Sequence, residues 1–106
     1  MATVGIAVSA VSNKASSGLN AVMPVPDANA AASAAVTSSA SSQTASVTAP
    51  SDGKQYYWII TASGGNVWVT FGSNPTAVAG TTYLIVDGTT RDFAASAAQK
   101  CAVIDG

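Results

Sequence analysis

The stretch Gly64–Pro75, GGNVWVTFGSNP, decides the fold class of this chain. Two glycines and an asparagine precede five residues of strand-forming type, and the Gly-Ser-Asn-Pro that follows has turn chemistry. Successive side chains of a strand point to opposite faces. Val67, Val69 and Phe71 therefore share one apolar face, which we predict to be the core face. Trp68 is then predicted to point away from the core.

Four further runs between residues 55 and 105 have the same composition, rich in aromatic and β-branched residues and separated by short turn segments. One of these turns is Asp87-Gly88, a pair suited to a tight turn because glycine tolerates positive φ. The runs are Gln55–Ala62, Thr82–Val86, Arg91–Ala95 and Lys100–Asp105. Short strands at this spacing predict an all-β fold, a small antiparallel β-sandwich of the jelly-roll or immunoglobulin-like kind.

The N-terminal half has a different composition. From Ala28 to Ala49 all but four residues are Ala, Ser or Thr. We expect residues 1–34 to form an extended arm, with a short Ala-rich helix capped by Asp27 as one alternative, and residues 35–106 to form the sandwich. Met23–Asp27 is extended around its two prolines and is interpreted as a hinge. Val36 and Val47 indicate one or two further strands.

Charge is unusually sparse: 4 Lys and Arg stand against 5 Asp and Glu in 106 residues, whereas soluble domains are roughly a quarter charged. Four scattered cations form no patch for phosphate, which argues against nucleic-acid binding. The chain has no histidine, so a Ser-His-Asp or Cys-His site cannot form. The commonest metal ligand is missing as well. We therefore expect no enzymatic activity, no metal and no cofactor.

The single cysteine, Cys101, cannot form a disulfide within the chain, and we interpret it as a small buried hydrophobic residue. The apolar N-terminus lacks a basic region before Lys14, which argues against an export signal. The uncharged segment 1–12 is too short to span a bilayer. These features predict synthesis in the cytoplasm and no membrane partner.

The second half resembles the small head decoration, or cement, proteins of tailed bacteriophages. The resemblance covers residues 43–106 and rests on ASGGNVWVTFGSNPTAVAG, then TYLIVDGTTRDF, and finally KCAVID near the C-terminus. It implies a non-enzymatic β-sandwich that binds the outer surface of an assembled capsid and stabilises it, in the form of a homotrimer. The implied partners are the major capsid protein and other copies of the chain. The implied location is the virion, after synthesis in the host cytoplasm.

Two sets of residues are candidates for contacts with partners, namely the apolar residues of the N-terminal arm and the aromatic and loop residues of the second half. They are Val4, Ile6, Val8, Val11, Leu19, Val22, Met23, Tyr57, Trp58, Trp68, Asn74 and Pro75. For Trp68, packing against the second sheet or under a loop is an equal alternative. A second functional hypothesis is a tail or head-fibre component or a sugar-binding sandwich, in which Tyr57 or Trp68 stacks on a sugar and Asn66 or Asn74 binds hydroxyls.

Overall fold

The computed structural model describes residues 2–15, 22–26, 30–53 and 55–106, and within these ranges it contains strands and no helix. The fold class predicted from sequence, a small antiparallel β-sandwich, is confirmed. The strands are β1 (Thr3–Ala15), β2 (Val22–Pro26), β3 (Ala32–Thr37), β4 (Gln43–Thr48), β5 (Tyr56–Ser63), β6 (Val67–Gly72), β7 (Tyr83–Ile85), β8 (Thr90–Ala95) and β9 (Lys100–Asp105).

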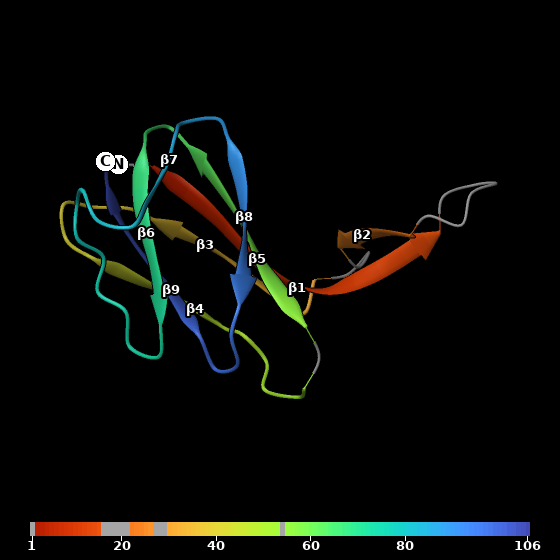
Figure 1. Cartoon of the computed structure of the whole chain (residues 1–106). Coiled ribbons are helices and arrows are strands. Elements are labelled where there is room, and N and C mark those ends of the chain that lie inside the picture. Colours follow the sequence, from red (N-terminus) through yellow and green to blue (C-terminus); the bar gives the residue numbers. More distant parts are fainter. Residues whose placement is uncertain (1, 16–21, 27–29, 54) are drawn as a thin grey trace.

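Two antiparallel sheets make up the sandwich (Figure 1). The first has the order β2-β1-β5-β8, with β3 also pairing with β1, and the second has the order β4-β9-β6-β7. The five strand-like runs of the second half of the sequence are strands β5 to β9. The core lies between the sheets, where side chains of β1 and β5 meet those of β4, β6 and β9.

Strand β1 corrects the expected boundary between an arm and a sandwich. Its residues 3–10 pair with β5 on one side, and residues 3–8 pair with β3 on the other, so they form a central strand of the first sheet. The segment has no aromatic residue to mark it as core, yet Val4, Ile6 and Val8 alternate with small residues and fill the interior. The N-terminal segment is therefore part of the sandwich up to Ala10.

The second half of β1 leaves the sandwich. Residues 11–15 pair with β2, whereas β5 ends its pairing with β1 at Tyr56 opposite Ala10. The result is a two-stranded ribbon that projects from one end of the molecule (Figure 1). Pro24 and Pro26 lie in β2, so residues 23–26 of the segment interpreted as a hinge are extended, as expected, and also paired.

The Ala-rich helix is not observed within the described residues, because residues 32–37 form strand β3. Residues 27–29, including the expected cap Asp27, lie outside the described residues. Along β3 the exposure alternates with every residue, and Ala32, Ala34 and Val36 pack against the core. Pairing with β1 and this burial outweigh the helix propensity of alanine, which is a weak preference.

Trp58 is the largest fully buried side chain of the core. Its ring lies 5.6 Å from that of Phe71, which lies 5.1 Å from Phe93. Phe93 in turn lies 5.2 Å from Tyr83. These rings connect β5 and β8 of the first sheet with β6 and β7 of the second, and they close the side of the sandwich on which β7 and β8 are the edge strands.

The two ends of the chain meet beside Ser38, as the neighbouring N and C labels of Figure 1 indicate. The backbone N–H of Ala2 donates to Oγ of Ser38 at 2.8 Å, and this hydroxyl donates to Oδ1 of Asp105 at 2.5 Å. Ser38 is fully buried. One hydroxyl therefore links the first residues of the fold to its last strand.

Candidate functional site

Four predicted interface residues are core residues, which corrects their assignment. Val4, Ile6, Val8 and Trp58 are each at most 2% exposed and belong to the main hydrophobic cluster. They cannot contact a partner while the sandwich is folded. For Trp58 the reason is that both faces of YYWII are apolar, so composition did not distinguish the inner face from the outer one.

Four other predicted interface residues, Val11, Leu19, Val22 and Met23, belong to the part of the sequence that contains the β1–β2 ribbon. The backbone of Val11, Val22 and Met23 lies in its paired strands, and Val22 is the partner of Ala15. The side chains of these residues, and the whole of Leu19, lie outside the described part of the structure. The ribbon projects beyond the sandwich body (Figure 1), so it is placed where another molecule can reach it.

Trp68 points away from the core, as its strand pattern predicts. Val67 and Val69 on either side are fully buried, while Trp68 is half-buried on the outer face of the second sheet. Its cross-strand neighbours are Leu84 of β7 and Ile104 of β9, and both are also half-buried. This outer face therefore carries an apolar cluster around an indole ring, the kind of surface that is enriched at protein contacts.

The loop after β6 holds two further predicted interface residues. Asn74 is exposed and Pro75 is half-buried. The loop is tied to the start of β4, because the backbone N–H of Ala77 donates to Oγ of Ser42 at 2.8 Å and Ala77 is buried. Asn66, the other amide proposed for sugar binding, accepts a hydrogen bond from the backbone N–H of Asp87 at 2.8 Å. Its oxygen thus has a structural role.

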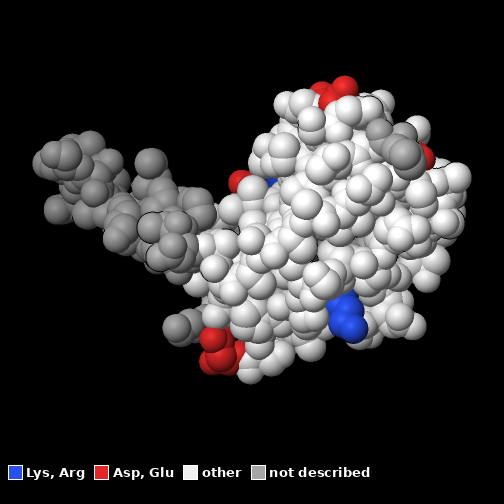
Figure 2. Space-filling view, turned by 180° about the vertical axis from the view of Figure 1, so that it is seen from behind, with Lys and Arg blue, Asp and Glu red and all other residues white. Residues whose placement is uncertain are grey.

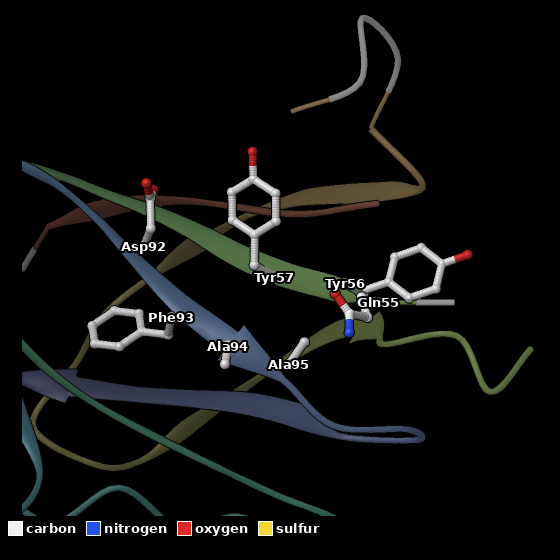
Figure 3. A pocket seen from close by; sticks show the side chains of 7 residues that line it. All are labelled: Gln55, Tyr56, Tyr57, Asp92, Phe93, Ala94 and Ala95. Carbon is white, nitrogen blue, oxygen red and sulfur yellow. The ribbon is translucent and has the colours of Figure 1, made fainter. Parts of the chain in front are cut away.

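A hollow of about 490 Å³ lies where β5 begins beside β8 and is lined by residues 55–57 and 92–95 (Figure 3). Tyr57 is half-buried, and Gln55, Asp92 and Ala94 are exposed. The register places Ala94 directly opposite Tyr57 and Asp92 opposite Ile59. Tyr57 and Asp92 are thus diagonal neighbours on one face of the sheet, and Figure 3 shows both side chains rising from that face.

The described charged side chains stand singly on the face of the molecule that Figure 2 shows. These acidic and basic groups stand on a surface otherwise made of uncharged residues.

A second hollow, of about 420 Å³, lies over β1 and β3 and is lined mostly by small residues such as Gly5, Ala7 and Ala35. A surface of this kind has little electrostatic selectivity and can approach another uncharged surface without repulsion.

The described residues offer few reactive groups. Among them there is no group of three or more side chains that could hold a metal ion. They also contain no helix that is long and apolar enough to cross a bilayer. Cys101 is fully buried, and desolvation raises the pKa of its thiol from 9.0 to about 12. Its thiol stays protonated at neutral pH, so it is a poor nucleophile.

Comparisons with protein-family models, with curated proteins and with solved structures found no significant match to this chain. The described geometry is consequently the basis on which its function can be argued. It offers a projecting ribbon, an outer-face tryptophan and a hollow beside Tyr57.

Sequence reasoning singled out Tyr57 but not Asp92 or Gln55 as site residues. Asp92 was assigned to the strand run Arg91–Ala95, and it lies within β8. What brings it close to Tyr57 is the β5–β8 register. The only sequence signal was Asp92 itself, a charged residue inside a run of strand composition, because such a side chain has to face solvent.

Proposed function

We propose that this chain is a structural virion protein of a tailed bacteriophage that binds the outer surface of the assembled capsid and stabilises it as a decoration, or cement, protein. The sequence resemblance described above supports the proposal. The structural observation that carries it is the nearly uncharged sandwich with a ribbon of strands β1 and β2 that projects from one end.

The surface suits a protein that is present in many copies on one shell. The formal net charge of the chain is −1, so neighbouring copies repel one another weakly. A protein that binds the assembled shell but not its separated parts stabilises the shell by mass action. Each copy needs only a modest affinity, because the effect is repeated over the particle.

The ribbon suits attachment by added strands. Residues 11–15 of β1 pair with β2 on one side, and no described strand pairs with them on the other. An isolated two-stranded ribbon is only marginally stable in water. A strand of the major capsid protein, or of a neighbouring copy in a homotrimer, would supply the missing pairing through main-chain hydrogen bonds.

The test uses the phage whose genome encodes this chain. Expanded capsids lacking the protein are mixed with purified protein, and binding is measured by co-sedimentation and electron microscopy. Bound protein should form a regular outer layer, and the decorated capsids should survive heating and low salt better than bare ones. The proposal fails if the protein does not bind and bare capsids are equally robust.

A tail or head-fibre component remains the second candidate, because the sandwich fold and Trp68 on the outer face also suit such a part. The same electron micrographs separate the two. A layer over the whole shell supports decoration, and density confined to the tail or to one fibre supports the alternative. The mass of the isolated protein in solution tests the homotrimer.

A further inference from the structure

We propose that the hollow beside Tyr57 is a binding site for a neutral sugar ring. The inference concerns a different surface from the ribbon and goes beyond capsid attachment. It rests on the placement of an aromatic ring, a carboxylate and an amide around one open depression between β5 and β8 (Figure 3).

Tyr57 supplies an aromatic surface. Its directly opposite neighbour on β8 is Ala94, whose side chain is a single methyl group. A residue this small leaves room above the sheet beside the phenol ring. The C–H groups on one face of a pyranose ring form a flat apolar surface, and an aromatic side chain packs well against such a surface.

Asp92 supplies hydrogen-bond acceptors at a suitable position. Its carboxylate is exposed, and within the described residues it makes no hydrogen bond and no ion pair. Its charged oxygens can accept hydrogen bonds from two adjacent hydroxyl groups of one sugar. Gln55, at the start of β5, adds to the lining an amide that both donates and accepts.

The charge and polarity of the lining residues restrict the chemical class of the ligand. No described residue of the lining is positively charged, and the carboxylate of Asp92 repels anions, so phosphates and acidic sugars fit poorly. A purely apolar ligand would cover that carboxylate without a hydrogen-bond partner, which costs free energy. A neutral ring with hydroxyl groups on its edge and C–H groups on its face satisfies every group. A hollow of about 490 Å³ is large enough for such a small molecule.

The experiment is a titration of the full-length, ¹⁵N-labelled protein with the methyl glycosides of glucose, galactose and mannose, followed by NMR. We expect saturable shift changes at amides of residues 55–57 and 92–95 with at least one glycoside. Tyr57→Ala should abolish them, and Asp92→Asn should weaken binding about tenfold, the loss expected for a charge-assisted hydrogen bond. Tyr83→Ala removes an exposed tyrosine that does not line the hollow, and it should bind like the wild type.

Three results would overturn the proposal. The first is the absence of saturable shifts with all three glycosides. The second is shifts that lie elsewhere or persist in Tyr57→Ala. The third is binding of glucosamine but of no neutral glycoside, which would indicate a cation site. If Tyr57→Ala does not fold, Ala94→Gln replaces it, because a longer side chain at this exposed position would cover the ring face and should also remove binding. Failure of capsid binding leaves this result unaffected, so the two proposals can fail separately.

Discussion

The indole N–H of Trp58 donates a hydrogen bond to Oε1 of Gln99 at 2.9 Å. Trp58 belongs to β5 of the first sheet, and Gln99 directly precedes β9 of the second. The same oxygen accepts a hydrogen bond from the backbone N–H of Ser96 at 3.1 Å. A fully buried tryptophan is thus satisfied by a residue of the turn between β8 and β9, which ties β5 to the segment that leads into the second sheet.

Replacing Gln99 with leucine should destabilise the fold by about 1–3 kcal/mol, because the buried indole N–H would lose its acceptor. Urea unfolding followed by circular dichroism measures the change. Gln55→Leu is the matched control, since Gln55 is exposed, and it should change stability by less than about 0.5 kcal/mol. Equal stability of the Gln99→Leu variant and the wild type would show that the hydrogen bond contributes nothing.

The chain has 2 tryptophans. Because they differ in burial, their replacement by alanine should reduce the free energy of unfolding by different amounts. Trp58→Ala should cost about 3–5 kcal/mol, because it leaves a cavity in the core. Trp68→Ala, at a half-buried position of the outer face, should cost less, about 1–2 kcal/mol. Thermal unfolding of the two variants checks the difference. A larger loss for Trp68→Ala would contradict the assignment of Trp58 to the core and Trp68 to the outer face.

Ser38→Ala should destabilise the fold by about 1.5–3 kcal/mol, the range for hydrogen bonds to charged groups. The variant removes both the acceptor for the backbone N–H of Ala2 and the donor to Asp105. Hydrogen exchange should show faster opening of β1 and β9 in particular. Ser46→Ala, at an exposed position of β4, is the control and should leave exchange unchanged. If the amides of β1 and β9 exchange at the same rate in Ser38→Ala as in Ser46→Ala, the Ser38 hydroxyl does not link the chain ends.

Cys101 makes stability depend on pH at the alkaline end. Burial raises the pKa of its thiol from 9.0 to about 12, so the unfolded chain loses this proton before the folded chain does. The stabilising contribution is complete below pH 9, and it declines by about 1.4 kcal/mol per pH unit as the pH rises toward 12. Urea unfolding at pH 7 and pH 10 should show a smaller loss in Cys101→Ala than in the wild type.

The same burial predicts that a thiol reagent reacts with Cys101 in urea and not in native buffer. Rapid labelling of the native protein would contradict the buried position. Equal pH dependence in Cys101→Ala and the wild type would contradict the raised pKa.

The projecting ribbon can be removed with little effect on the sandwich. Replacing residues 11–29 with Asn-Gly should join Ala10 to Ala30 through a tight turn, because the β1–β3 register already brings Val8 opposite Ala32. We expect a similar melting temperature, since residues 3–10 keep their pairing with β5. Capsid binding should be lost in the co-sedimentation assay. Undiminished binding by the folded variant would exclude the ribbon as the attachment element.

Much of the fold could be predicted from the sequence because its second half has strong local signals. The alternation of side chains in NVWVTF correctly predicted that Trp68 points away from the core, and turn residues correctly marked the breaks between strands β5 to β9. The first half lacks such signals, since alanine and serine suit a helix, a strand or a loop about equally. The hollow beside Tyr57 was only partly foreseen, because β5 and β8 are far apart in the sequence and their register is not encoded locally.

The sequence by itself determined that the domain is all-β, because side chains alternate along single strands. Its composition determined that the surface carries few charges and that histidine takes no part in any site. Only the tertiary structure decided that residues 3–10 form a central strand, that Trp58 rather than Trp68 fills the core, and that Asp92 stands near Tyr57. Each of these depends on which distant strands pair and in which register. That choice is made by packing of the whole sandwich and not by any one segment.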